Sequence, residues 1–403
     1  MTDTKALIAD SQRYIANTYS RYPVVLVRGQ GCKVWSSDGT EYLDFVAGLA
    51  VCNLGHCHPK VVQAIQDQSR TLIHVSNFYH IEPQIELAKV LCENSFADRV
   101  FFCNSGAEAN EAAIKLAKKY AKDTGRGDKF EIITMERSFH GRTMATLSAT
   151  GQDKFRKGFD PLLPGFKYVP FNDMEAVLRT VSPHTCAIMV EPIQGEGGVN
   201  CPSAGYLRDL RELCRERGIL LIFDEVQVGM GRTGRLFAHE HDGVYPDIMS
   251  LAKSLAGGVP IGAMLATEEV AKSFTPGTHA STFGGNPLAT AAGLAAVSAL
   301  LEDGVLENCK GVGEHFFRQL MDLKGKYPFI QEVRGRGLII GMELGFEGSQ
   351  IVGRCLEEGF LINCTMENVL RFLPPLIVTT GEVDQLIGVM DGILGECGEG
   401  VGS

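Results

Sequence analysis

Short apolar runs alternate with helix-like segments through the middle of this chain. The apolar runs have the length of buried strands, and the segments between them repeat apolar residues at helical spacing. The expected strands are residues 99–103, 130–135, 186–190 and 219–223, and the expected helices include 107–122 and 206–217. Because strands separated by helices are joined by right-handed crossovers, this alternation predicts an α/β fold. Its large domain should have a mainly parallel sheet covered by helices.

A different pattern follows the helix that Asn286 caps and Pro287 begins. Short apolar runs now lie among helices, at residues 329–335, 338–344, 360–363 and 369–373. They predict a smaller α+β domain. Near the other end, residues 33–44 have the pattern of a hairpin around Asp38 and Gly39. We expect an N-terminal segment packed with the small domain (1–55), a large domain (56–290) and a small C-terminal domain (291–403).

Composition excludes several classes of protein. The 403 residues carry a net charge of −10 and are 45% hydrophobic and 21% charged, as in globular proteins. A negative chain without a basic run is not expected to bind nucleic acid. The N-terminus lacks a basic region followed by an apolar core, and no apolar stretch reaches the ~18–20 residues of a spanning helix. We expect a soluble, cytoplasmic protein without a membrane partner.

Cysteine usage points to a reducing compartment. Twelve cysteines are scattered without a C-x-x-C pair, so free thiols are expected. Cys52, His56, Cys57 and His58 form the one cluster that suggests a metal. No second ligand pair at zinc-site spacing follows, so a tight turn through Gly55 is the favoured interpretation. No metal is expected.

The apolar run at 220–223 ends in Asp224, which it delivers to the edge of the predicted sheet. Lys253 lies in an apolar stretch, where an amine is unusual. Pyridoxal phosphate (PLP) accounts for both residues. Its ring nitrogen stays protonated beside a buried carboxylate, and its aldehyde needs a lysine amine. Asp224 and Lys253 are therefore the predicted catalytic residues.

Ser105 and Gly106 lie where a predicted strand passes directly into a helix. The start of a helix presents unpaired N–H groups and partial positive charge, which suit a phosphate. Taken alone, an ordinary helix capped by Ser105 explains the segment better. A phosphate cup becomes the favoured interpretation once other motifs indicate a phosphorylated cofactor.

Two further segments are expected at the same edge of the sheet. Phe139 and Arg142 follow the strand at 130–135, where an aromatic ring can stack on a cofactor and an arginine can bind a carboxylate. A core phenylalanine and a solvated arginine explain them equally well. Glu196 lies in a glycine-rich turn after the strand at 186–190. Ligands bind at the carboxyl ends of parallel strands, so these side chains are candidates for the site.

Residues 229–234 match the dinucleotide fingerprint G-x-G-x-x-G. The following residues, 235–247, carry His, Gly and Pro rather than a helical pattern, and no strand ending in an acid lies ~20 residues on. We interpret the segment as a turn beside the site. A nicotinamide-dependent oxidoreductase and a non-enzymatic binding protein remain remote alternatives.

Taken together, the motifs resemble those of the class III (ω-amino) aminotransferases of PLP fold type I, over nearly the whole chain. The resemblance is carried by residues 105–110, 138–142, 191–198, 224–227, 253 and 279–286. It implies a homodimer with shared active sites. The implied cofactor-binding residues are Ser105, Gly106, Ala107, Phe139, Asp224, Gln227, Lys253 and Thr282 of the partner subunit. The implied substrate-binding residues are Arg142, Glu196, Ser281 and Arg371.

The resemblance also implies a role for most of these side chains. The three residues at the start of the helix would hold the phosphate, together with Thr282 of the partner subunit. Phe139 would stack on the cofactor ring, and Asp224 would pair with its nitrogen. Gln227 would lie near the ring hydroxyl, and Lys253 would attach the cofactor covalently.

The implied substrates are N2-acetylornithine, as amine donor in arginine biosynthesis, and 2-oxoglutarate, with N-acetylglutamate 5-semialdehyde and glutamate as products. One substrate brings an amine to the reacting carbon, whereas the other has a carboxylate beside it. An Arg371 that pairs with Glu196 in the first half-reaction and is released in the second would serve both, while Arg142 binds the distal carboxylate. Succinylornithine, ornithine and 4-aminobutyrate stay open as donors, with succinyldiaminopimelate as a second substrate.

Overall fold

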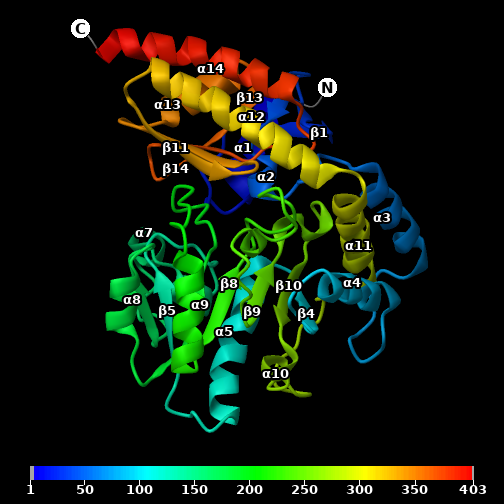
Figure 1. Cartoon of the computed structure of the whole chain (residues 1–403). Coiled ribbons are helices and arrows are strands. Elements are labelled where there is room, and N and C mark those ends of the chain that lie inside the picture. Colours follow the sequence, from blue (N-terminus) through cyan, green and yellow to red (C-terminus); the bar gives the residue numbers. More distant parts are fainter. Residues whose placement is uncertain (1–3, 402–403) are drawn as a thin grey trace.

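The computed structural model describes residues 4–401, and a seven-stranded sheet forms its centre (Figure 1). The strand order is β4-β10-β9-β8-β7-β5-β6. The bounds are Arg99–Cys103 (β4), Glu131–Met135 (β5), Phe166–Val169 (β6), Thr185–Val190 (β7), Leu220–Asp224 (β8), Ile248–Leu251 (β9) and Gly262–Ala266 (β10). Strand β10 runs antiparallel to both of its neighbours, while the pairs from β9 to β6 are parallel. The expected mainly parallel sheet is confirmed.

Helices cover both faces of this sheet. Successive strand residues point to opposite faces, so Ile132 and Ile222 pack with α5 (Gly106–Asp123), whereas Ile133 and Leu221 pack on the other face with α8 (Met174–Thr180) and α9 (Tyr206–Arg217). All four of these strand side chains are buried. The runs that read as continuous apolar segments in the sequence are therefore strands buried on both sides, as parallel sheets require.

The small domain is built on an antiparallel sheet of order β11-β12-β15-β14. Its strands are Ile330–Arg336 (β11), Ile339–Leu344 (β12), Asn363–Thr365 (β14) and Val369–Phe372 (β15). Helices α12 (Val305–Lys326), α13 (Ser349–Glu357) and α14 (Thr380–Val401) accompany it (Figure 1). An antiparallel sheet and three helices in one small unit confirm the expected α+β domain.

A second four-stranded sheet joins the two ends of the chain. Its order is β1-β2-β3-β13, with β1 at Leu26–Gln30, β2 at Lys33–Ser36, β3 at Glu41–Asp44 and β13 at Phe360–Leu361. The antiparallel pair β2 and β3 is the expected hairpin, and Leu43 of β3 pairs with Phe360 in parallel. The expected single strand at 360–363 is wrong, because the chain changes sheets at Ile362. The three domain boundaries themselves stay a prediction.

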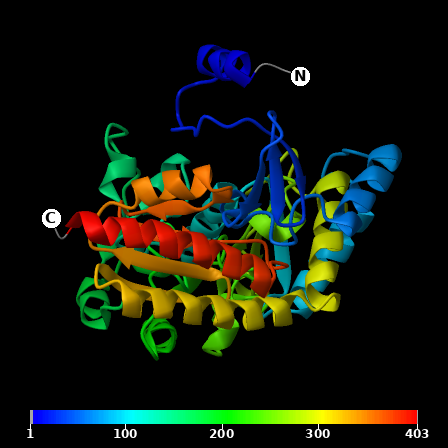
Figure 2. The same cartoon turned by 90° about the horizontal axis from the view of Figure 1, so that it is seen from above.

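The remaining helices are α1 (Thr4–Tyr14), α2 (Ala47–Ala50), α3 (Pro59–Thr71), α4 (Glu82–Glu93), α6 (Met144–Ala149), α7 (Asp153–Arg156), α10 (Glu268–Ala271), α11 (Pro287–Glu302) and the 3₁₀ turns η1 (Ala238–His241) and η2 (Lys253–Ala256). Helix α1 projects from the body, which it contacts through a 2.6 Å hydrogen bond between the Thr4 and Ser37 hydroxyls, and it buries none of its residues (Figure 2). Between residues 4 and 401 no single helix is long and apolar enough to span a membrane. The pair α11 and α12, bent by 63°, passes that test of length and composition only when taken together.

Candidate active site

A cavity of about 390 Å³ opens at the carboxyl end of the central sheet. Strands β4, β7 and β8 each end at its wall, as expected for a ligand site in such a sheet. The predicted residues that line it are Ser105, Gly106, Ala107, Phe139, Arg142, Glu196, Asp224, Gln227 and Lys253. Val51, next to the short helix α2, also lines it.

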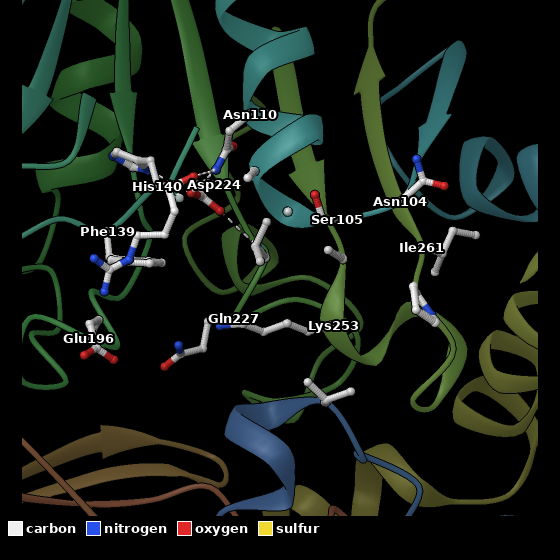
Figure 3. A pocket seen from close by; sticks show the side chains of 18 of the residues that line it. Asn104, Ser105, Asn110, Phe139, His140, Glu196, Asp224, Gln227, Lys253 and Ile261 are labelled. Atoms are coloured by element: carbon white, nitrogen blue, oxygen red, sulfur yellow. Dashed lines mark hydrogen bonds and ion pairs between the residues drawn. The ribbon is translucent and has the colours of Figure 1, made fainter. Parts of the chain in front are cut away.

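Asp224 is buried and held by three hydrogen-bonding groups (Figure 3). Its Oδ1 accepts the Val226 N–H at 3.0 Å, and its Oδ2 accepts Asn110 Nδ2 at 2.7 Å. His140 Nδ1 lies 2.7 Å from the same Oδ2. The carboxylate is thus fixed in one orientation at the cavity wall. His140 Nε2 has no hydrogen-bond partner.

Asn110 and His140 were not among the predicted site residues, although the motifs at 105–110 and 138–142 contain them. The sequence did contain a signal for Asn110, which is a polar residue among alanines such as Ala109 and Ala113 on the buried face of α5. A buried polar side chain needs a partner, and Asp224 is that partner.

Lys253 begins the 3₁₀ turn η2 with a left-handed backbone, φ 48°. A side chain other than glycine rarely adopts this conformation, and such strain concentrates at functional sites. Burial lowers the pKa of the amine to about 8, and the positive charge of Arg371 acts in the same direction. Lys253 therefore has a larger neutral, nucleophilic fraction near neutral pH than an ordinary lysine.

The start of α5 forms another part of the wall. Ser105 is the N-cap, and its Oγ accepts the Glu108 N–H at 3.2 Å. The capped-helix interpretation is therefore confirmed, but it leaves the first N–H groups of the helix, at Gly106 and Ala107, beside the cavity. A Cβ on Gly106 would come within 2.7 Å of Val226 Cγ1, so only glycine allows this close approach.

Phe139 and Arg142 lie together on the wall. The Phe139 N–H donates to Glu191 Oε2 at 3.1 Å, and burial, followed by the charge of Asp224, raises the pKa of Glu191 well above its usual value. The Arg142 guanidinium lies 4.1 Å from the ring centre of Phe155 and 5.5 Å from that of Phe139. Stacking on these rings orients the arginine while leaving its N–H groups for a ligand.

Arg371, on β15, does not line the cavity but bonds to two side chains that do. Its Nη1 lies 3.0 Å from Glu196 Oε2 and donates to Gln227 Oε1 at 3.3 Å. Its Nε and Nη2 both donate to Asn363 Oδ1, at 2.9 and 2.7 Å. The side chain of Arg371 is 2% exposed and that of Glu196 is 28% exposed. The pair that we expected is present, and Asn363 is a contact that the sequence did not indicate.

Ser281 and Thr282 lie outside the cavity of the single chain. Ser281 Oγ is 3.3 Å from Asn104 Nδ2, which reaches it from the wall, and this chain's own Thr282 is exposed. The phosphate contact assigned to Thr282 of the partner subunit stays a prediction, as does substrate binding by Ser281.

The turn at 229–234 has a structural role that its fingerprint did not suggest. A 3₁₀ turn rather than a helix follows it. Arg232 Nη1 donates to the carbonyls of Leu338 and Pro374, at 2.9 and 2.6 Å, and Nη2 donates to Asn53 Oδ1. Burial lowers the pKa of Arg232 to about 10. This guanidinium thus connects the N-terminal segment, the large domain and the small domain.

The residues of the cavity fit pyridoxal phosphate. A lysine amine, a fixed carboxylate and a helix N-terminus face one space whose volume lies within the range of small-molecule sites. In the part of the chain that the structure describes, no three His, Cys, Asp or Glu side chains gather as metal ligands. His56, from the cluster considered above, is instead 2.7 Å from Asp44.

The sequence model of the family described as aminotransferase class-III matches residues 14–394. The chain belongs to this family of PLP-dependent transaminases. Among its relatives, the acetylornithine aminotransferase of Caldanaerobacter subterraneus subsp. tengcongensis is 54% identical and covers 97% of this chain and 99% of its own. That of Methanocaldococcus jannaschii is 56% identical and covers 96% and 97%. Family membership removes the oxidoreductase and binding-protein alternatives.

Solved structures agree with the fold. The ornithine aminotransferase of Toxoplasma gondii superposes with a TM-score of 0.95 at 37% identity and covers 99% of this chain and 96% of its own. A second structure of that enzyme, with a TM-score of 0.93, 37% identity and coverage of 97% and 94%, has PLP at partial occupancy in the active site. Fold type I and the cofactor are thereby confirmed.

Proposed function

We propose that this enzyme transfers the terminal amino group of N2-acetylornithine to 2-oxoglutarate, giving N-acetylglutamate 5-semialdehyde and glutamate. The names and identities of its relatives support acetylornithine as the amine donor. We place the reaction in arginine biosynthesis in the cytoplasm and the enzyme in a homodimer, with Thr282 of the partner subunit at the phosphate. We also propose the domain boundaries given above, with the N-terminal segment ending at residue 55 and the large domain at residue 290.

The single observation that carries the proposal is the ion pair of Arg371 and Glu196 beside the cavity. Near the reacting carbon, an amine substrate disfavours a bare cation, whereas 2-oxoglutarate needs one for its carboxylate. Glu196 neutralises Arg371 in the first case. Because the Glu196 side chain is partly exposed, it can leave when a substrate carboxylate takes its place. Arg142 binds the distal carboxylate in both halves.

Pyridoxal phosphate, when bound, supplies an aldehyde for the substrate amine and a protonated ring that draws electrons from the reacting carbon. The start of α5 would hold its phosphate, Asp224 would keep the ring nitrogen protonated, and Phe139 and Gln227 would orient the ring. Lys253 Nζ would take the proton from the substrate carbon as general base and return it as general acid.

Initial rates with N2-acetylornithine, succinylornithine, ornithine and 4-aminobutyrate, each against 2-oxoglutarate, test the proposal. We expect the highest kcat/KM for N2-acetylornithine, since kcat/KM measures the discrimination between competing donors. A higher value for ornithine or 4-aminobutyrate would replace the proposed donor while leaving the family chemistry unchanged.

A further inference from the structure

Two small-domain side chains hold the loop that carries Glu196. Thr365 Oγ1 donates to the backbone carbonyl of Glu196 at 2.5 Å. Arg334 donates from Nε and Nη2 to the carbonyl of Gly198, at 3.0 and 2.7 Å. The main chain at Glu196 and Gly198 is therefore held by two residues that lie far from it in the sequence.

The loop itself leaves little room for backbone movement. A Cβ on Gly195 would overlap Gln227 Oε1, and a Cβ on Gly197 would overlap the carbonyl of Arg137. Gly198 has φ +113°, a conformation that other residues rarely adopt. Because the main chain is confined in this way, the freedom of Glu196 lies in its partly exposed side chain.

Strand β14 positions both members of the ion pair. Asn363 and Thr365 lie two residues apart on this strand, so their side chains point to the same face. Asn363 accepts two hydrogen bonds from the Arg371 guanidinium, while Thr365 holds the main chain of Glu196. Strand β14 thus sets the distance between the Arg371 guanidinium and the loop that carries Glu196.

Arg334 is itself held in place. Its Nη1 lies 2.6 Å from Glu332 Oε2 and 2.5 Å from Glu343 Oε2, and its side chain is 12% exposed. Two carboxylates on one side and the Gly198 carbonyl on the other leave the guanidinium a single orientation.

We propose that Thr365 and Arg334 are positioning residues that set how strongly Glu196 competes with a substrate carboxylate for Arg371. The inference rests on the proposed role of Arg371 in binding that carboxylate. With the Glu196 main chain fixed, the carboxylate returns to Arg371 whenever the site is empty. Without these hydrogen bonds, only the packing at Gly195 and Gly197 holds the main chain, so the pair weakens and Arg371 accepts substrate carboxylates more readily.

Calorimetric titration of the PLP-loaded enzyme with glutarate tests this without turnover, since glutarate has both carboxylates of 2-oxoglutarate but no keto group. We expect Thr365→Val to tighten glutarate binding ~3- to 10-fold, the value of one hydrogen bond. Thr365→Ser keeps the hydroxyl and should bind as the wild type does. Glu196→Ala should tighten binding further, and Thr365→Val added to it should change nothing more.

Arg334→Ala should act in the same direction as Thr365→Val. Its matched control is Arg336→Ala on the same strand, which removes a cation that lies 3.8 Å from Asp242 and does not contact the loop. If Thr365→Val does not fold, this second pair of variants carries the test. The control should leave glutarate affinity unchanged.

Three results would overturn the inference. They are an unchanged affinity in Thr365→Val and Arg334→Ala, an equal effect of Thr365→Val with and without Glu196, and a glutarate affinity that Glu196→Ala does not alter. The first means that the two side chains serve domain packing alone, and either of the others means that they do not act through competition by Glu196. Failure of the proposed function looks different. An enzyme inactive with N2-acetylornithine that still shows the glutarate pattern would refute the donor and leave the inference standing.

Discussion

Burial sets the properties of the individual residues in the cavity. It lowers the pKa of the Lys253 amine, and it raises that of the Glu191 carboxyl. Asp224 is also buried, and three hydrogen-bonding groups fix its carboxylate in one orientation. Burial thus favours the neutral forms of both Lys253 and Glu191, and shifts of this kind cluster at functional sites.

The first prediction concerns the pH dependence of cofactor attachment. The neutral form of Lys253 reacts with the aldehyde, and its pKa is lowered to about 8 in the cofactor-free protein. The rate of covalent attachment should therefore rise with pH through about 8 and level off above it. Rapid-mixing absorbance of apoprotein with PLP gives the profile. Borohydride reduction and peptide mapping should mark Lys253, and a midpoint near 10.5 would contradict the burial effect.

The second prediction concerns Asp224. Asp224→Asn should keep the fold and lose about 3–5 kcal/mol of transition-state stabilisation in kcat, because an amide does not hold the ring proton. His140→Phe removes one of the hydrogen-bonding groups of Asp224, so its kcat should lose about 1.5–3 kcal/mol of transition-state stabilisation. His239→Phe is the matched control, since His239 forms a buried pair of the same 2.7 Å length with Glu225 outside the cavity. Near-normal kcat in Asp224→Asn would make that residue structural.

The third prediction separates the two half-reactions. Glu196→Ala leaves Arg371 unpaired beside the reacting carbon, so single-turnover reactivity with N2-acetylornithine should fall. Reactivity with glutamate should be kept or rise, since its carboxylate pairs directly with the guanidinium. Bleaching of the cofactor absorbance reports each donor alone. Equal losses for both donors would mean that Glu196 shapes the loop rather than masking a charge.

Among the secondary-structure elements, β10 brings the sheet and the start of α5 together. Gly262 lies where β10 passes the Ser105 loop, and a Cβ there would come within 2.3 Å of the Ser105 carbonyl. The glycine is therefore required by close backbone approach, although its own φ is ordinary. Strand β10 is also the one reversed strand of the central sheet.

The fourth prediction follows from this contact. Gly262→Ala should push the Ser105 loop away, weaken PLP affinity at least about tenfold and destabilise the fold by about 1–3 kcal/mol, as overpacking does. Fluorescence titration of the apoprotein and thermal unfolding measure the two effects. Gly127→Ala meets no atom within 4 Å and should change neither. Unchanged PLP affinity in Gly262→Ala would mean that the loop tolerates displacement.

Local patterns predicted the elements that have a clear apolar pattern. The strand at 99–103 and the helix at 206–217 have their predicted bounds, because the first is a short apolar run and the second repeats apolar residues at helical spacing. Strand β10 was not predicted, since its sequence of Gly, Ala, Met, Leu and Ala has no β-branched residue. The break at Ile362 was missed for another reason. Whether a short apolar run pairs with β3 or β15 depends on partners far away in the chain.

The same limit applies to the site. Asp224 and Lys253 were predictable because charged residues in apolar runs need a reason. Arg371 came from the resemblance alone, and Asn363 from neither source. Its amide holds Arg371 across two strands, and no local pattern marks such a contact.

At the scale of the whole molecule, Arg232 connects three parts of the chain through one buried guanidinium. No carboxylate neutralises it within hydrogen-bonding distance among residues 4–397, where its partners are carbonyls and the Asn53 amide. The fifth prediction is that Arg232→Met lowers the free energy of unfolding by about 2–4 kcal/mol, because two buried carbonyls lose their donor. Arg232→Lys should lose less of this free energy than Arg232→Met. Chemical denaturation measures the stability of both variants. Stability equal to the wild type in Arg232→Met would show that water replaces the guanidinium.

The pairing of β3 with β13 has a consequence for synthesis on the ribosome. Strand β3 emerges early, but its neighbour begins at Phe360, near the end of the chain. At ~5–20 residues per second, β3 waits roughly 15–60 s for this partner. During that time its edge has unpaired backbone groups, which are a template for pairing with other chains. The N-terminal sheet is therefore begun first, but it is completed only after all seven strands of the central sheet have been made.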